Sequence, residues 1–248
     1  MSDLKDKVAL ITGSSRGIGA AIVRLFASRG AKVAIHGRDT NAIDAVYTDI
    51  ERQGGIATKV VADVTKFDQI QAMRQQVERA FGPIDILVTS AGGSFTPSGP
   101  LENVTEEGWR AAVEGNLTAT FLTIESVLPS MKARNTGSII TISSAAGRKP
   151  HPQAPIPYSA AKAGIQVLTQ DVAAQVGPYG IRVNCIAPET ILTQGNRQRI
   201  PETQIRPLID IHPIKLTGNS RRGSTKYRPH HPLILNEVAD TRGNWMSR

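Results

Sequence analysis

Residues 8–19 read Val-Ala-Leu-Ile-Thr-Gly-Ser-Ser-Arg-Gly-Ile-Gly, and this stretch decides the fold. Its first five residues form an apolar run that ends at Gly13, as expected of a strand buried on both faces. Beyond the glycines, apolar side chains recur on one helical face as far as Gly30, at Ile18, Ile22, Leu25 and Phe26. The stretch therefore predicts a buried strand, a glycine-rich turn and an amphipathic helix.

The same strand–helix unit repeats along the chain. Short apolar runs predict strands at residues 8–12, 32–35, 59–62, 84–89, 138–143 and 181–187. Longer periodic stretches predict helices at residues 18–29, 40–53, 68–81, 105–131 and 158–176. A barrel of this type needs about eight such units, and only six are readable. The pattern favours an α/β fold with a doubly wound parallel sheet, whose ligand crevice lies at the carboxyl ends of the strands.

The first turn has the composition of a phosphate-binding loop. Gly13 permits the tight exit from the strand, Gly17 lets the backbone approach a pyrophosphate, and Gly19 lets the helix pack closely on the sheet. The free N–H groups and positive end of the helix would then bind the phosphates. An ordinary glycine-rich turn is the alternative, but the position at the first crossover favours a dinucleotide.

The spacing Thr12-Gly13-x₃-Gly17-x-Gly19 resembles the signature of the short-chain dehydrogenase/reductase family, and the resemblance extends from about Lys7 to about Lys215. The resemblance implies a Rossmann-type fold and a nicotinamide cofactor. Within the family, the sequence is similar to members such as 3-oxoacyl-[acyl-carrier-protein] reductases. The whole turn is then assigned to cofactor binding, namely Gly13, Ser14, Ser15, Arg16, Gly17, Ile18 and Gly19.

The end of the second strand bears on the choice of cofactor. An acidic residue there would bind the ribose 2′-hydroxyl of NAD, but in the register of the family Gly37 takes that position and Arg38 follows it. Arg16 offers a second guanidinium, and such groups suit a 2′-phosphate. NADP(H) is therefore preferred, with NAD(H) as the alternative. In that alternative, Arg38 is merely solvated and Asp39 binds the ribose.

The resemblance implies further cofactor contacts after later strands. They comprise Asp63 and Val64, then Ser90, Ala91 and Gly92, and finally Pro188, Ile191 and Thr193. Two positions depart from the family. Thr89-Ser90 stands where Asn-Asn is usual, and Glu189 follows Pro188 where Gly is usual.

Tyr158 and Lys162 lie one helical turn apart, which places a phenol and an ammonium on one face. A free Tyr titrates near pH 10, and a nearby ammonium, together with an oxidised nicotinamide, favours the phenolate. Ser143 and Ser144 end the fifth strand, and either hydroxyl could hydrogen-bond a substrate carbonyl. The resemblance favours Ser144.

Asn116 lies within the predicted long helix, where Asn is a poor helix former. It could simply face solvent. The resemblance instead implies that it anchors a water linking Lys162 to a proton relay. Asn116, Ser144, Tyr158 and Lys162 are the candidate catalytic residues, and Tyr158 and Lys162 are also expected to contact the cofactor.

These residues predict reduction of a ketone to a secondary alcohol by NADPH, with Tyr158 as the proton donor and a 3-oxoacyl thioester as one substrate class. Two alternatives stay open. The chain could be an NAD(P)-dependent dehydrogenase of a sugar, polyol or other secondary alcohol. It could also be a nucleotide-binding protein that has lost turnover because its C-terminal tail is atypical.

Composition limits the other functional classes. The net charge is +8, but residues 213–248 hold seven Lys and Arg against two Asp and Glu, which leaves 22 basic and 19 acidic residues in 1–212. Without a recognised module, this charge does not indicate nucleic-acid binding. No apolar run spans a membrane, and the N-terminus indicates no signal peptide, so we expect a cytoplasmic protein. The chain's one cysteine, Cys185, is expected in the core, and His230-His231 lacks companion metal ligands.

The chain divides at about residue 215. Residues 1–215 are predicted to form one domain, with a substrate lid at 194–212 that contains Arg197, Arg199 and Arg206. These arginines could attract an acidic substrate or simply be solvated. Residues 216–248 form an atypical basic tail without strand periodicity, as an altered reading frame near Leu216 could produce. No regular seventh strand is expected. A homodimer or homotetramer is predicted, and the tetramer contact that the family builds from its final strand is expected to be weak.

Overall fold

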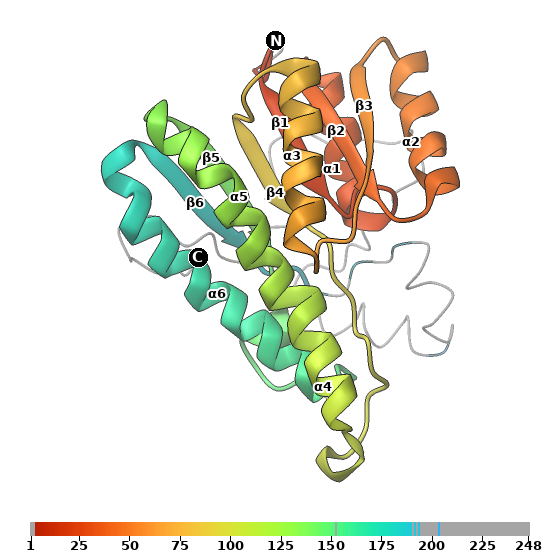
Figure 1. The fold of residues 1–248 in the computed structure, drawn as a ribbon. Coiled ribbons are helices and arrows are strands. Elements are labelled where there is room, and N and C mark those ends of the chain that lie inside the picture. Colours follow the sequence, from red (N-terminus) through yellow and green to blue (C-terminus); the bar gives the residue numbers. More distant parts are fainter. Residues whose placement is uncertain (1–2, 152, 190, 192, 194–202, 204–248) are drawn as a thin grey trace.

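The computed structural model describes residues 3–151, 153–189, 191, 193 and 203. Six strands form a parallel sheet in the order β3-β2-β1-β4-β5-β6. From β1 the chain moves outward to β3, then returns to β4 and moves outward in the other direction (Figure 1). The fold is the expected doubly wound, Rossmann-type sheet, and the point where the strand order reverses lies between β1 and β4.

The elements have the following bounds. The strands are β1 (Val8–Thr12), β2 (Lys32–Gly37), β3 (Ile56–Val61), β4 (Ile86–Thr89), β5 (Gly137–Ile142) and β6 (Ile181–Ile186). The α-helices are α1 (Gly17–Ser28), α2 (Thr40–Arg52), α3 (Phe67–Phe81), α4 (Glu106–Val113), α5 (Ala119–Ala133) and α6 (Ile156–Val176). Shorter helical segments are η1 (Leu101–Asn103), η2 (Glu114–Thr118), η3 (Ala145–Gly147) and η4 (Gly177–Tyr179).

Two hydrophobic cores lie on opposite faces of the sheet because successive strand side chains point to opposite sides. On β1, Leu10 belongs to the core beneath α3, α5 and α6, whereas Ile11 belongs to the core beneath α1 and α2. Both side chains are fully buried. Helices thus cover both faces of the sheet, as the near-continuous apolar strands predicted (Figure 1).

The expected long helix over residues 105–131 is the main departure from the predicted elements. It is divided into α4, the π-helical segment η2 and α5. The Nδ2 of Asn116 donates a 2.8 Å hydrogen bond to the carbonyl of Ala112, a group that a regular α-helix pairs with the backbone N–H of residue 116. The widened turn places Asn116 in the interior, where it is fully buried, rather than facing solvent.

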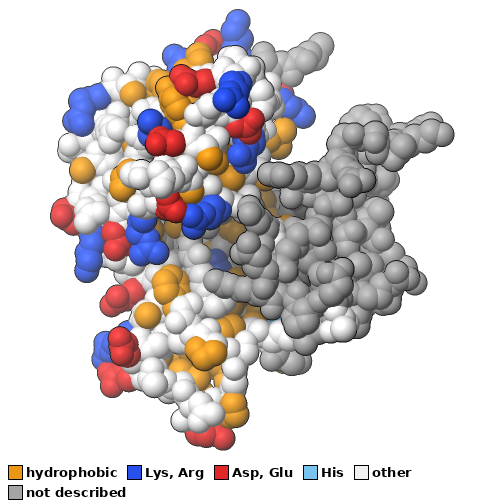
Figure 2. Space-filling model, turned by 90° about the vertical axis from the view of Figure 1, so that its right-hand side faces the viewer, with side chains coloured by type: hydrophobic (Ala, Val, Ile, Leu, Met, Phe, Trp, Pro, Cys, Tyr) orange, Lys and Arg blue, Asp and Glu red, His pale blue; other side chains and the backbone are white. Residues whose placement is uncertain are grey.

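The substrate lid and the basic tail lie outside the described residues, except for Thr203, as does the prediction that no regular seventh strand forms. Within the described part, no helix combines the length and apolarity that a membrane crossing requires. On the face drawn in Figure 2, basic and acidic side chains are interspersed over the upper part of the described surface.

Candidate active site

The carboxyl ends of β1 and β4 are joined by one side chain. Thr12 pairs with Thr89 in the sheet, and its Oγ1 accepts hydrogen bonds from the backbone N–H groups of Ser90 (3.2 Å) and Ala91 (3.3 Å). The two predicted cofactor loops therefore meet where the strand order reverses. This is the position at which doubly wound sheets bind ligands.

The glycine turn is packed as its sequence predicted. A Cβ at Gly13, whose φ is +67°, would lie 2.7 Å from the Cα of Ala91, so only glycine allows this approach. A Cβ at Gly19 would collide with the carbonyl of Gly13, which brings α1 against the turn. Gly17 opens α1 with a φ of +56°, and a Cβ there would lie 3.5 Å from Cγ2 of Thr193. The turn and the predicted contact Thr193 thus face each other.

The amino end of α1 is suited to an anion. The N-cap residue Arg16 makes no side-chain capping hydrogen bond, and the first turn holds no acidic residue. In contrast, the amino end of α2 is capped by the carboxylate of Asp39, which accepts from the N–H of Ala42. The first N–H groups of this 12-residue helix, which the N-cap side chain does not engage, lie behind a glycine-rich turn and fit a phosphate group.

Ser14 lies beneath this turn. It is fully buried, and its Oγ donates to the carbonyl of Ile11 at 2.7 Å while accepting from the N–H of His36 at 2.9 Å. Ser15 and Ile18 are half-buried at the start of α1. The structure thus uses the Ser14 side chain to hold the turn on β1 and β2.

The end of β2 has no room for an acidic side chain at position 37. A Cβ at Gly37 would lie 2.7 Å from Oγ and 2.9 Å from Cβ of Ser15. Next to it, Arg16 forms an ion pair with Asp39, and Arg38 is exposed. Asp39, the alternative ribose ligand, is therefore engaged with α2 and with Arg16.

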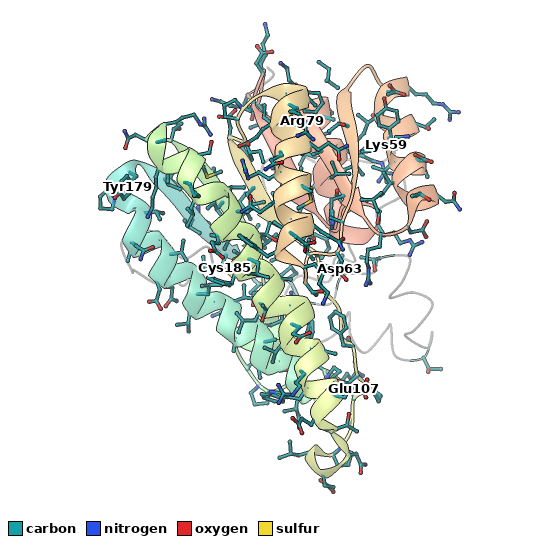
Figure 3. All side chains as sticks on the ribbon, viewed as in Figure 1. Lys59, Asp63, Arg79, Glu107, Tyr179 and Cys185 are labelled. Atoms are coloured by element: carbon teal, nitrogen blue, oxygen red, sulfur yellow. The ribbon has the colours of Figure 1, made fainter. Side chains whose placement is uncertain are left out.

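The loops after β3 and β4 lie at the same edge of the sheet, where Figure 3 labels Asp63. Asp63 Oδ1 accepts from both the N–H and the hydroxyl of Thr65, and the backbone hydrogen bond is the main reason why the pKa of Asp63 lies below its usual value. Val64 is buried. After β4, Ser90 and Ala91 are half-buried and Gly92 is exposed.

Asn116 holds the loop after β4 through its side-chain amide. Its Nδ2 donates to the carbonyl of Gly93 at 2.9 Å, and its Oδ1 accepts from the N–H of Gly93 at 3.2 Å. A Cβ at Gly92 would lie 2.5 Å from this Oδ1 and 3.5 Å from Nζ of Lys162. Asn116 and Lys162, far apart in the sequence, are thereby brought to the same loop.

The two serines after β5 have different roles. Ser143 is buried, donates to the carbonyl of Lys162 at 2.7 Å and accepts from Nε2 of Gln166 at 3.0 Å. The Ser144 Oγ instead accepts from the N–H of Ala146 at 3.2 Å and lies near enough to the Tyr158 phenol to lower its pKa. Of the two hydroxyls, Ser144 is therefore the one beside the phenol.

Tyr158 and Lys162 share one face of α6, as the spacing predicted. The Lys162 Nζ lies 5.6 Å from the centroid of the Tyr158 ring and donates to the carbonyl of Ile142 at 2.8 Å. Burial lowers the pKa of Lys162 to about 8. Burial also raises the pKa of Tyr158, although the neighbouring Ser144 hydroxyl acts in the opposite direction. Among the groups that the protein itself supplies, desolvation therefore outweighs those that favour the phenolate.

The loop after β6 closes the other side of the site. The buried Pro188 accepts a hydrogen bond from the N–H of Ala145 at 3.0 Å, and Thr193 donates its N–H to Ile191 at 2.8 Å. Glu189 forms a 2.7 Å ion pair with Lys149. This pair joins the loops after β5 and β6.

Two features of the site were not predicted from sequence. One is the ion pair between Arg16 and Asp39. The other is His36, whose imidazole is buried against the glycine turn; the only sequence signal for it is a polar residue in an otherwise apolar run. Cys185 is buried as expected, and the described residues contain no group of three or more side chains suited to a metal ion.

Comparison with known proteins gives consistent matches. The family model described as short chain dehydrogenase matches residues 7–204. A 3-oxoacyl-[acyl-carrier-protein] reductase from Synechocystis sp. is 37% identical over 225 residues, which cover 89% of this chain and 90% of that protein. Glucose 1-dehydrogenase 2 from Bacillus subtilis is 34% identical over 218 residues, covering 87% and 84%. The crystal structure of a 3-oxoacyl-[acyl-carrier protein] reductase from Brucella melitensis superposes with a TM-score of 0.82 at 31% identity, covering 88% of this chain and 81% of that one.

Proposed function

The chain belongs to the short-chain dehydrogenase family, and from this premise we propose that it is an NADPH-dependent reductase that converts a ketone to a secondary alcohol. Membership makes it an oxidoreductase of CH–OH or carbonyl groups that uses NAD(P)(H). The direction, the preferred cofactor and the substrate are our proposals.

One observation carries the proposal. The Ser144 hydroxyl lies beside the Tyr158 phenol and lowers its pKa, and the buried ammonium of Lys162 lies 5.6 Å from the centre of the phenol ring. A proton donor, a second hydroxyl and a cation therefore converge at the carboxyl edge of the sheet. This set suits a reaction in which negative charge develops on a carbonyl oxygen.

Each residue then has a role in the reduction. When bound, the nicotinamide supplies a hydride to the carbonyl carbon. The Tyr158 hydroxyl donates its proton to the carbonyl oxygen, while the Ser144 hydroxyl donates a hydrogen bond to the same oxygen. Lys162 would hold the nicotinamide ribose and favour the phenolate that remains. Asn116 keeps the Gly92–Gly93 loop against Lys162 through its two hydrogen bonds to Gly93.

The glycine turn and the loops around it would hold the dinucleotide. The phosphates would bind the first N–H groups of α1, beside Gly17 and Thr193. The adenosine half would lie by Asp63 and Val64, and the nicotinamide half by Ser90, Pro188 and Ile191. A 2′-phosphate suits the end of β2, since Gly37 excludes a carboxylate and Arg16 and Arg38 are exposed there.

The substrate class rests on similarity. The match to the Synechocystis reductase extends over about nine-tenths of both chains, which supports a 3-oxoacyl thioester. The similarity to Glucose 1-dehydrogenase 2 supports the alternative, oxidation of a sugar, polyol or other secondary alcohol. A third possibility, nucleotide binding without turnover, depends on the tail, which lies outside the described residues.

A screen of NADPH oxidation tests the proposal. The purified full-length chain is mixed with NADPH and with 3-oxoacyl thioesters, sugars or simple ketones, and the loss of NADPH absorbance is recorded. We expect turnover with a 3-oxoacyl thioester. Turnover confined to the oxidation of alcohols by NAD(P)⁺ would favour the alternative, and cofactor binding without any turnover would favour the third possibility.

We also propose a homodimer built on α5 and α6. Phe121 on α5 and Val167 on α6 are large apolar side chains that are 46% and 57% exposed. Burying such side chains against a second copy would be favourable. Light scattering of the protein and of the Val167→Asp variant tests this, with a monomeric variant as the expected result. A cytoplasmic location stays a prediction.

A further inference from the structure

The imidazole of His36 is a buried polar group that hydrogen-bonds the backbone of the glycine turn. His36 lies on β2 and is only 3% exposed. Its Nδ1 lies 2.9 Å from the backbone nitrogen of Gly13, and its Nε2 lies 3.0 Å from the carbonyl oxygen of Ala62. One ring therefore bridges the turn after β1 and the end of β3.

These two partners determine the protonation state of the ring. The N–H of Gly13 can only donate, so Nδ1 must carry a lone pair. The carbonyl of Ala62 can only accept, so Nε2 must carry the hydrogen. Both hydrogen bonds therefore require the neutral imidazole with its proton on Nε2. A protonated ring would place an N–H against the N–H of Gly13 and break that contact.

The backbone of β2 strengthens the attachment. Ser14 N–H donates to the carbonyl of His36 at 2.9 Å, and the N–H of His36 donates to Ser14 Oγ at 2.9 Å. On the other side, Ala62 directly precedes Asp63, the predicted contact for the adenine. His36 thus lies between the phosphate end and the adenosine end of the proposed cofactor site.

We propose that His36 is a positioning residue for the dinucleotide: its neutral ring holds the peptide of Gly13 in the orientation that binds the phosphates, and its protonation releases the turn and weakens cofactor binding. This inference rests on the proposed function, because it requires that the cofactor bind at this turn. It extends that function by assigning a pH dependence to cofactor affinity.

The electrostatic environment favours the neutral ring at neutral pH. Burial is the main cause of a His36 pKa below 6.5, and Arg38 lowers it further. The hydrogen bond to Ala62 and the charge of Asp63 act in the opposite direction. Among the described residues, Arg38 and Asp63 are thus the charged groups that act on the ring, one directly after β2 and one in the loop after β3.

Two matched substitutions separate the two hydrogen bonds. In His36→Asn, the amide oxygen can take the place of Nδ1 and accept from Gly13 without titrating. In His36→Gln, the longer side chain can still donate to Ala62, but it offers no acceptor at the Nδ1 position. His36→Leu removes both bonds.

The experiment measures equilibrium binding of NADPH by its fluorescence between about pH 5 and pH 8. We expect His36→Asn to bind within about threefold of wild type at neutral pH, and His36→Gln and His36→Leu to bind about tenfold more weakly. At saturating NADPH, kcat should stay close to that of wild type. A purely structural role would instead lower kcat at saturating NADPH in parallel with affinity.

The loss of NADPH affinity at acidic pH is compared between wild type and variants, because the 2′-phosphate of NADPH itself titrates near pH 6 and affects all of them. Below pH 6.5, the affinity of wild type for NADPH should fall more steeply with decreasing pH than that of His36→Asn. The control His151→Asn, at another histidine, should show the same steep fall as wild type. Equal slopes in wild type and His36→Asn would overturn the inference, as would wild-type affinity in His36→Gln. If wild type binds neither NADPH nor NADH, the proposed function fails instead.

Discussion

Gly37 and Ser15 lie so close together that a Cβ at position 37 would be 2.7 Å from the Ser15 hydroxyl oxygen. The side chain of Ser15 in the glycine turn therefore limits which residue can stand at position 37, at the end of β2. A carboxylate side chain at position 37, where the family usually places the residue that binds the NAD ribose, would displace the Ser15 side chain of the glycine turn. This relationship couples the choice of cofactor to the conformation of the turn.

We predict that NADPH binds at least tenfold more tightly than NADH, which corresponds to about 1.4 kcal/mol. Arg38→Ala should weaken NADPH binding and leave NADH binding nearly unchanged, because in the proposed binding mode it removes a cation that contacts the 2′-phosphate and no other part of the cofactor. Fluorescence titration measures both constants, and the exposed Arg52→Ala, at the end of α2, is the control. Equal weakening of both cofactors by Arg38→Ala would contradict the assignment.

The contact between Gly37 and Ser15 predicts a non-additive change of specificity. Gly37→Asp alone should weaken both cofactors, since its Cβ displaces Ser15 and distorts the turn. The double variant Gly37→Asp/Ser15→Gly removes the obstacle, so its carboxylate can bind the ribose hydroxyls and repel a 2′-phosphate. The ratio of the two affinities should then shift toward NADH by at least about tenfold. The same loss in single and double variants would show that Ser15 is not the obstacle.

Tyr158→Phe should abolish turnover while leaving NADPH affinity nearly intact, because the substitution removes only the hydroxyl that donates the proton. The expected kcat is below about one-hundredth of the wild-type value. Tyr179→Phe, on an exposed ring outside the site, is the matched control and should keep full activity. Retention of more than about a tenth of kcat by Tyr158→Phe would place the proton donor elsewhere.

The buried ammonium of Lys162 predicts a specific pH dependence of stability. Its pKa in the folded protein is about 8, below the ordinary value of 10.5, so between these two pH values the unfolded chain binds more protons than the folded one. Wild type should therefore gain stability relative to Lys162→Met as the pH rises from 8 to 10.5, by at most about 3 kcal/mol. Denaturant unfolding at several pH values measures this difference.

The matched control for Lys162 is Lys5→Met, which replaces an exposed lysine near the N-terminus. Wild type and Lys5→Met should show the same trend with pH. A constant difference between wild type and Lys162→Met over this interval would mean that Lys162 stays protonated in the folded protein.

The sequence alone was sufficient for the features that depend on neighbouring residues. The six strands, the glycine turn and the pairing of Tyr158 with Lys162 on one helical face all follow from local periodicity and spacing. Strand ends differ by a few residues; β3, for example, begins at Ile56 rather than Lys59, because pairing with β2 extends the exposed end of this edge strand. The π-helical turn at Asn116 also escaped prediction, since the helical period continues across it.

Only the tertiary structure decided what surrounds the reactive groups. Three features of the site depend on segments that are far apart in the chain. They are the burial that raises the Tyr158 pKa, the contact of Gly37 with Ser15 and the ion pair of Arg16 with Asp39. The same is true of His36, whose ring nitrogens bond residues 23 positions before it and 26 positions after it. Spacing along a helix or strand determines which side chains share a face. Desolvation and hydrogen-bond partners depend on how distant elements pack together, so they appear only in the folded protein.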